Sequence, residues 1–295
     1  MARVVVTRSL PFPALDRLRA AHDVVEGGTW RDAIHDAEGL LCLLTEQVDA
    51  EVLDAAPKLR VISNYAVGAD NIDVEEARRR GIAVGVTPGV LTDATADLTI
   101  ALMLNASRRV DEAARDARNG RWQTWEPAGW LGLELRRATI AIVGWGRIGK
   151  AVAERAGAFG MEVVPVGRDD GWEVAARADV VSLHVPLTAE TRGMVGAAEL
   201  SAMKPGAILI NTARGALVDT DALVDWLQQR KGAAALDVTD PEPLPPGHPL
   251  YDLPNALVVP HIGSATHTAR ARMAEAAVDN LLAGLEGRPL PNPAK

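Results

Sequence analysis

The chain has 295 residues, of which 48% are hydrophobic and 24% are charged, and its formal net charge is −8 at neutral pH. This composition excludes a disordered chain and is sufficient for two globular domains. The negative charge argues against a general nucleic-acid binder, because nonspecific affinity for phosphate backbones comes from clustered Lys and Arg.

The single cysteine, Cys42, excludes an internal disulfide. It lies in the apolar run GLLCLL, which is typical of a buried thiol in a reducing compartment. The amino-terminal residues lack the apolar core of a signal peptide, and the chain nowhere has about 18 consecutive apolar residues. We therefore expect a cytoplasmic protein with no membrane contact and no metal site.

Over the first 92 residues, short apolar or β-branched runs alternate with segments of helical periodicity. The alternation is typical of βαβ units and a parallel sheet, so it predicts one small doubly wound domain. The predicted strands are residues 3–7, 39–44, 60–63 and 82–84, and the predicted helices are residues 13–21, 49–56 and 74–80.

Residues 65–72, YAVGADNI, follow one of these strands and place Gly68 where the chain must turn sharply. Loops at the carboxyl ends of parallel strands commonly bind ligands, and exposed N–H groups there could hold a carboxylate. An ordinary turn is the alternative interpretation.

A long helix is predicted next, over residues 92–110, with Thr92 or Asp93 as its N-cap and a role in bridging two domains. Behind it, Trp122, Trp125 and Trp130 lie in an irregular segment with Pro and Gly. Large aromatic side chains in such a segment indicate a packed interface between subunits, or else packing within the chain.

The central motif is a strand-like run, residues 139–143, that passes into Gly144, Gly146 and Gly149 at G-x-G-x-x-G spacing and then into a helical pattern. This context is typical of a turn that cradles a dinucleotide pyrophosphate at a helix N-terminus. Further strands are predicted at residues 162–166, 179–184, 207–210, 233–236 and 257–259.

These elements predict a dinucleotide-binding domain of residues 93–265. The last helix, near residues 266–284, must return to the first domain, which therefore comprises residues 1–92 plus 266–295. A site for a small molecule is expected between two such domains.

Three later loops place Arg214, Glu242 and His261 after predicted strands. An arginine can bind a carboxylate through two hydrogen bonds, a histidine can protonate a nascent alkoxide, and a neighbouring glutamate can orient that histidine. Together they suggest carbonyl reduction, or alcohol oxidation in reverse. Taken alone, Arg214 could equally cap the preceding strand or pair on the surface, Glu242 could face water, and a histidine such as His261 is more often structural than catalytic. His184 is better interpreted as a lining of the adenosine side than as a catalyst.

The chain resembles the D-2-hydroxyacid dehydrogenase family nearly end to end, through NYAVGADNID, VGWGRIG, HVPLTAETRGMV, NTARGALVD, ALDVTDPEPLP and PHIGSAT. The sequences of the last two motifs resemble those of the glyoxylate reductase/hydroxypyruvate reductase branch. The resemblance implies a Rossmann dinucleotide domain inserted into a flavodoxin-like substrate domain, and the reduction of hydroxypyruvate to D-glycerate and of glyoxylate to glycolate. It also implies a homodimer.

The same resemblance implies roles for individual residues. Arg214 would bind the substrate, His261 would be the general acid/base and Glu242 would orient it. Substrate contacts would also come from Val67, Gly68, Ser264 and a neighbouring subunit's Trp130. Asp237 would hold the nicotinamide carboxamide, and the other cofactor contacts would be Gly144, Gly146, Arg147, Ile148, Gly149, Gly167, Arg168, His184, Pro186, Thr191, Thr212, Ala213, His261 and Gly263.

The choice of dinucleotide depends on the end of the strand at residues 162–166. Gly167 and Arg168 resemble the NADPH-preferring members, because an arginine there can face a 2′-phosphate, whereas Asp169 keeps NADH possible. Only nine residues separate Asp169 from the strand that starts at Asp179, fewer than the family normally has, so the wall of the adenosine pocket is expected to be shortened.

Other functions stay open from the sequence. The chain could be a D-lactate or phosphoglycerate type of dehydrogenase, or a dinucleotide-sensing protein like the corepressors of this superfamily. Formate oxidation is disfavoured, because Glu242 occupies the position at which the resemblance to formate dehydrogenases leads us to expect glutamine.

Overall fold

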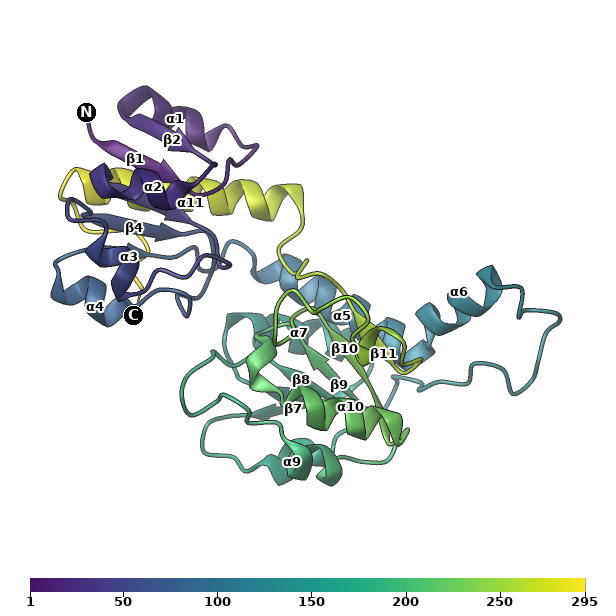
Figure 1. The fold of residues 1–295 in the computed structure, drawn as a ribbon. Coiled ribbons are helices and arrows are strands. Elements are labelled where there is room, and N and C mark those ends of the chain that lie inside the picture. The colour runs from purple at the N-terminus through teal and green to yellow at the C-terminus, as the bar shows by residue number, and fades with distance from the viewer. Residues whose placement is uncertain (295) are drawn as a thin grey trace. The chain divides into compact units, whose positions relative to one another are not determined.

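The computed structural model describes residues 1–294. The chain forms two compact units: Met1–Leu91 with the chain from Ala265 onward, and Thr92–Ser264 (Figure 1). Both are α/β units built on a parallel sheet, so the predicted fold class is confirmed. No helix in the described residues is both long and apolar enough to cross a membrane.

The first unit contains five parallel strands in the order β2-β1-β3-β4-β5. These strands are β1 (Arg3–Val6), β2 (Asp23–Glu26), β3 (Gly39–Cys42), β4 (Val61–Asn64) and β5 (Ala83–Gly85). The order is that of a flavodoxin-like doubly wound sheet. β2 was not predicted, because its sequence DVVE is short, half-exposed and charged at both ends.

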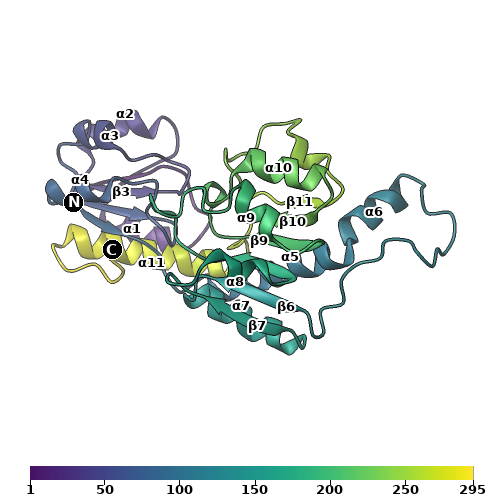
Figure 2. The same ribbon diagram turned by 90° about the horizontal axis from the view of Figure 1, so that it is seen from below.

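Helices cover both faces of this sheet. They are α1 (Ala14–Ala21), α2 (Trp30–Ala33), α3 (Ala50–Asp54), α4 (Val74–Arg79) and α11 (His267–Leu285), and Ile34–Asp36 forms a 3-10 turn. Strand residues such as Leu40 and Ile62 pack with α3 and α4. The strand residues that alternate with them point to the other face of the sheet, towards α11, where the side chain of Asn280 donates a hydrogen bond to Ser63. Figure 2 shows α1 and α11 on the face opposite α2 and α3.

The second unit has six parallel strands in the order β11-β10-β9-β8-β6-β7. They are β6 (Thr139–Val143), β7 (Glu162–Val166), β8 (Val180–Leu183), β9 (Ala207–Asn211), β10 (Gly232–Leu236) and β11 (Ala256–Val258). The predicted strands are confirmed with shifts of a residue or two at the ends. The order reverses at β6, so a crevice for a ligand is expected where β6 and β8 end.

Two buried layers fix the helices of this unit to its sheet. The helices are α5 (Thr92–Arg108), α6 (Val110–Arg118), α7 (Arg147–Ala158), α8 (Trp172–Ala176), α9 (Ala197–Ala202) and α10 (Thr220–Gln228), and 3-10 turns occur at Gly215–Leu217 and Pro249–Tyr251. α5 and α7 pack on one face with Ile140 and Ile210, and α8 to α10 pack on the other with Val181 and Leu209.

The shortened segment after Asp169 contains α8, and no further strand lies between β7 and β8. β7 is therefore the edge of the sheet. Its Pro165 fits this position, because an edge strand does not need every backbone N–H for pairing.

The helix predicted over residues 92–110 is interrupted. α5 starts at Thr92, so Thr92 and Asp93 lie in its first turn, and it ends at Arg108 because Arg109 adopts a left-handed φ of 51°. α6 then begins, and with the following loop it projects from the rest of the second unit as an arm of residues 110–134 (Figure 1). α6 buries none of its residues.

Candidate active site

Two of the three motif glycines are required by the protein's own packing. A Cβ at Gly144, where φ is 101°, would lie 2.6 Å from the carbonyl carbon of His184, and one at Gly149 would lie 2.2 Å from the carbonyl oxygen of Gly144. Neither contact is possible for a larger residue, because real Cβ atoms do not approach backbone so closely. These glycines hold β6, the start of α7 and the end of β8 together.

Gly146 differs from its two neighbours in the motif. It is the N-cap of α7, and a Cβ there would meet no atom of the described residues within 4 Å. The space beside it is therefore open, next to the first unpaired N–H groups of a twelve-residue helix, where Arg147 and Ile148 form the first turn. This cradle fits a pyrophosphate group, which needs close backbone approach and the positive end of a helix.

His184 cannot act as an acid near neutral pH. Burial lowers the pKa of its ring to about 4, so the imidazole is neutral, and Nε2 lies 2.8 Å from Ser182 Oγ. Its backbone carbonyl packs against Gly144. Its position next to the glycine turn is compatible with the lining role expected from the sequence.

Two other expected cofactor residues, Thr191 and Gly167, lie in turns that are held by local hydrogen bonds. Thr191 Oγ1 donates to the carbonyl of Pro186 at 2.7 Å. Gly167 N–H donates to Asp170 Oδ2 at 2.7 Å, which shapes the end of β7. Arg168, in the same turn, is exposed and makes no ion pair with any residue that the structure describes.

The backbone around Arg214 is held by a residue to which the sequence assigned no role. Asn211 is 1% exposed at the end of β9. Its Oδ1 accepts from the N–H of Ala213 at 3.0 Å, and its Nδ2 donates to the carbonyl of Arg214 at 2.7 Å. The asparagine thus ties together both sides of the turn that presents Arg214. Asparagine at the start of a turn is the available sequence signal for this role.

Asp237 fixes the loop after β11. Its side chain, in a residue that is 1% exposed, accepts from the N–H groups of Ile262 at 2.6 Å and Gly263 at 2.9 Å. Burial raises the pKa of this carboxyl although both hydrogen bonds oppose the shift. Its carbonyl also accepts from His261 N–H at 2.9 Å. The nicotinamide role expected for Asp237 would use the lone pairs that remain.

His261 and Glu242 form a close pair. His261 Nδ1 lies 2.5 Å from Glu242 Oε1, and the two side chains are 24% and 30% exposed. His261 has a left-handed φ of 50°, which is uncommon for a residue other than glycine and is held here by Asp237. The Nε2 atom has no hydrogen-bond partner within residues 1–294, so it is the ring nitrogen that remains for a ligand.

Arg214, Glu242 and His261 follow three neighbouring strands, β9, β10 and β11, which run parallel. Their loops therefore lie along one edge of the sheet, the same edge that carries the glycine turn after β6. Ser264 follows in the His261 loop. A basic group and a paired histidine beside a dinucleotide cradle are suited to proton-coupled chemistry on an acid substrate.

Comparison with known proteins agrees with this chemistry. Residues 100–263 match the family model described as D-isomer specific 2-hydroxyacid dehydrogenase, NAD binding domain. The chain belongs to the D-2-hydroxyacid dehydrogenase family. A glyoxylate reductase from Thermofilum pendens is 46% identical, with 97% of this chain and 92% of that protein covered. The human glyoxylate reductase/hydroxypyruvate reductase is 40% identical, with 100% and 98% covered.

Solved structures show the same relationship. A protein from Thermus thermophilus is 55% identical and superimposes with a TM-score of 0.93 over 99% of this chain and 100% of that one. The NADPH-dependent glyoxylate/hydroxypyruvate reductase of Sinorhizobium meliloti, solved with NADP and malonate, is 33% identical with a TM-score of 0.88, covering 99% and 96%. The family assignment makes this chain an oxidoreductase that uses a nicotinamide dinucleotide.

Within the first unit of this dehydrogenase, the buried side-chain amides of Asn64 and Asn71 hold the loop after β4 through hydrogen bonds. Asn64 Nδ2 donates to the carbonyl of Gly68 at 2.8 Å and to Asn71 Oδ1 at 2.7 Å. Val67, at the loop's tip, is 39% exposed. Cys42 lies beneath the same cluster as a buried free thiol, 3.5 Å from Asn64 Oδ1.

The expected substrate residue Trp130 lies in the arm of the dehydrogenase's second unit. Its indole N–H donates to Asp116 Oδ2 of α6 at 3.0 Å, so it contacts its own arm. Trp122 and Trp125 are 65% and 80% exposed and are the more available aromatic side chains for a partner.

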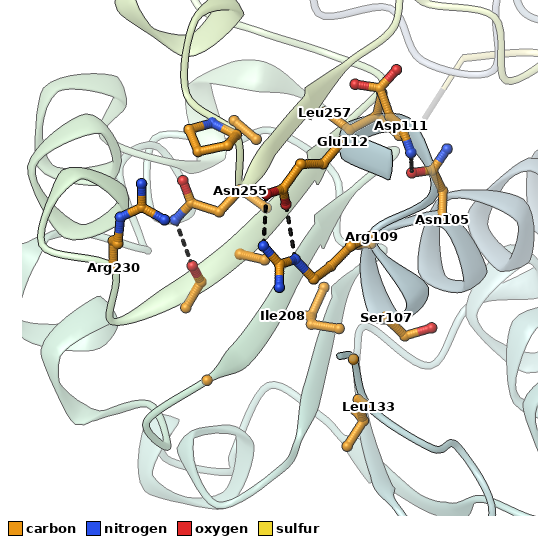
Figure 3. Close-up of a pocket in the computed structure, with 18 of the residues that line it drawn as sticks. Asn105, Ser107, Arg109, Asp111, Glu112, Leu133, Ile208, Arg230, Asn255 and Leu257 are labelled. Carbon is orange, nitrogen blue, oxygen red and sulfur yellow. Dashed lines mark hydrogen bonds and ion pairs between the residues drawn. The ribbon is translucent and has the colours of Figure 1, made fainter. Parts of the chain in front are cut away.

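One large cavity of the second unit, of about 560 Å³, lies away from the candidate site. Gly206, Gly232 and Ala256 line it where β9, β10 and β11 begin, at the opposite edge of the sheet. Figure 3 shows Arg109, paired there with Glu112. The base of the arm supplies the other wall, through Leu131. The cavity is thus not part of the chemistry at the carboxyl edge.

Proposed function

We propose that this chain reduces small 2-keto acids with a nicotinamide dinucleotide, converting glyoxylate to glycolate and hydroxypyruvate to D-glycerate. The observation that carries the proposal is the His261–Glu242 pair, 2.5 Å apart, on the sheet edge that also presents Arg214. Relatives at 40–46% identity that bear the names of these reductases support it. They do not favour the lactate, phosphoglycerate or corepressor alternatives.

The bound dinucleotide would supply hydride to the carbonyl carbon of the substrate. His261 would give the proton from Nε2 to the carbonyl oxygen as charge develops there. Glu242, on Nδ1, would fix the ring and favour its protonated form before transfer. Arg214 would bind the substrate carboxylate and polarise the carbonyl. The backbone at Val67 and Gly68 would hold the carboxylate as well.

Residues 1–92 with 266–295 would serve as the substrate domain, and residues 93–265 as the dinucleotide domain. Gly146 and the α7 N-terminus fit the pyrophosphate. We propose NADPH over NADH, because Arg168 is exposed at the end of β7 and is available for a 2′-phosphate. The NADPH-dependent relative from Sinorhizobium meliloti supports this preference.

We also propose that the protein is a homodimer joined through the arm. α6 buries no residue and the arm exposes Trp122 and Trp125, which is costly unless another surface covers them. Replacing both tryptophans with serine should convert the dimer to a monomer in light scattering. A monomeric wild-type protein would remove this part of the proposal.

A cytoplasmic location without nucleic-acid or membrane partners completes the proposal. The net charge of −8 and the single buried thiol support it.

The function is tested by following dinucleotide absorbance with glyoxylate, hydroxypyruvate, pyruvate and 3-phosphohydroxypyruvate, each with NADH and NADPH. We expect turnover with the first two substrates and a lower KM for NADPH. Arg168→Ala should remove that preference.

The catalytic assignment is tested by His261→Ala and Arg214→Ala, each of which should lower kcat/KM by at least about 10²-fold. The matched control is His35→Ala, because His35 is an exposed histidine of the first unit. Wild-type turnover in either of the first two variants would refute the assigned roles.

A further inference from the structure

α5 contacts two of the loops that carry the proposed chemistry. Thr95 and Thr99, one helical turn apart, are 4% and 0% exposed. Thr99 Oγ1 lies 2.9 Å from Thr212 Oγ1, two residues before Arg214. Thr95 Oγ1 donates to the carbonyl of Gly263 at 3.3 Å, two residues after His261. One face of α5 therefore contacts both the Arg214 loop and the His261 loop, in each case two residues away from the side chain with the proposed chemistry.

The direction of the first hydrogen bond follows from the number of hydrogens. Thr99 Oγ1 donates its only hydrogen to the carbonyl of Thr95 at 2.8 Å. The hydrogen between Thr99 and Thr212 must then belong to Thr212. The Thr212 hydroxyl is thereby oriented towards α5.

The second hydrogen bond continues a chain of contacts to the histidine. Gly263, whose carbonyl Thr95 binds, gives its N–H to Asp237, and Asp237 also holds Ile262 and His261. A Cβ on Gly263 would approach both Asp237 Oδ2, at 3.0 Å, and Thr95 Oγ1, at 3.4 Å. The peptide of Gly263 is therefore clamped between the helix and the aspartate.

We propose that Thr95 and Thr99 are positioning residues that fix the Arg214 loop and the His261 loop relative to each other. The inference rests on the proposed function, because only then must Arg214 and His261 act on one substrate. Residues four apart on a helix are separated by about 6 Å along its axis, and the backbone hydrogen bonds of the helix keep that spacing constant. Loops anchored only to their own strands would not be related in this way.

The test uses isosteric changes. Thr99→Val and Thr95→Val each remove a hydroxyl without changing side-chain volume, and Thr99→Ser and Thr95→Ser restore it. Thr7→Val is the matched control, because Thr7 is also buried, in the first unit, and its hydroxyl has no hydrogen-bond partner in the described residues. Each purified full-length variant is assayed for kcat, KM, dinucleotide Kd, Tm and amide hydrogen exchange.

The two variants should differ in kinetics. Thr99→Val should raise the KM for glyoxylate, because the arginine loop shifts, and Thr95→Val should lower kcat, because the histidine loop shifts. We expect about 10-fold in each case, within the roughly 10²-fold that a displacement of 1 Å can cost. The serine variants should recover most of the loss, and Thr7→Val should match the wild type.

Hydrogen exchange gives a result that does not depend on turnover. The amide of Ala213 should exchange faster in Thr99→Val, and that of Gly263 in Thr95→Val, although neither amide is bonded to the replaced hydroxyl. Unchanged exchange together with unchanged kcat and KM would overturn the proposal. So would a fall in Tm with normal kinetics, which indicates a purely structural role. A wild-type protein that reduces no 2-keto acid would refute the proposed function, whereas the exchange result would still test the anchoring.

Discussion

The loop that carries His261 should depend on a single buried carboxylate, so Asp237→Asn is the most informative substitution. The carboxylate accepts two backbone N–H groups, at 2.6 and 2.9 Å. An asparagine offers one oxygen, and its amide would face the second N–H donor to donor. A hydrogen bond to a charged group contributes about 1.5–3 kcal/mol, and one such bond is lost.

Relief of the buried charge offsets part of this loss, because the raised pKa of Asp237 shows that burial disfavours its ionised form. We therefore expect a net loss of about 2 kcal/mol in the free energy of unfolding. For a unit of this size that corresponds to a fall in Tm of about 4–8 °C. Since His261 loses the support of its neighbours, kcat should fall at least about 10-fold as well.

The assay is differential scanning calorimetry of the protein without dinucleotide, followed by steady-state kinetics. Measurement without dinucleotide separates the loop-holding role of Asp237 from a role in binding nicotinamide. The control is Asp240→Asn, because Asp240 is a half-exposed carboxylate whose ion pair with Arg192 spans 3.9 Å. A variant at position 237 with wild-type Tm and kcat would refute the reasoning.

Three further predictions concern the cofactor cradle, the buried histidine and the loop after β4. Gly146→Ala should keep the Tm and weaken dinucleotide binding in a fluorescence titration, whereas Gly144→Ala should lower the Tm, because only the second Cβ meets protein atoms. The pKa of His184 falls from 6.5 in the unfolded chain to about 4 in the folded protein, so its protonation favours unfolding. This residue should therefore not reduce the free energy of unfolding above pH 6.5, and should lower it by roughly 3 kcal/mol as the pH falls toward 4. His184→Asn should remove that part of the acid transition, and an unchanged pH profile would contradict this. Asn64→Ala should raise the KM for glyoxylate with the dinucleotide Kd unchanged, because Asn64 holds the Gly68 carbonyl; an unchanged KM would count against this loop as a substrate contact.

The strands at the centre of each sheet were predictable because their information is local. Residues 140–143 and 207–210 are apolar throughout, as is typical of strands buried on both faces. The turn at Gly144, Gly146 and Gly149 was equally predictable, because the spacing of the glycines is also local information. β2 and α6 were missed, since an exposed edge strand and a helix without a buried face carry no strong apolar pattern. The helix over residues 92–110 was drawn too long, because a left-handed arginine at position 109 leaves no trace in the sequence.

The sequence by itself determined which chemical groups this protein has and on which loops they lie. Arg214, Glu242 and His261 each follow a strand, and parallel strands end at one edge, so their grouping could be predicted. Only the tertiary structure decided how they are held. Asp237 reaches the amides of Ile262 and Gly263 across 25 and 26 residues, and Thr99 reaches Thr212 across 113. Such hydrogen bonds depend on packing that brings distant segments together, and no local periodicity or spacing encodes them.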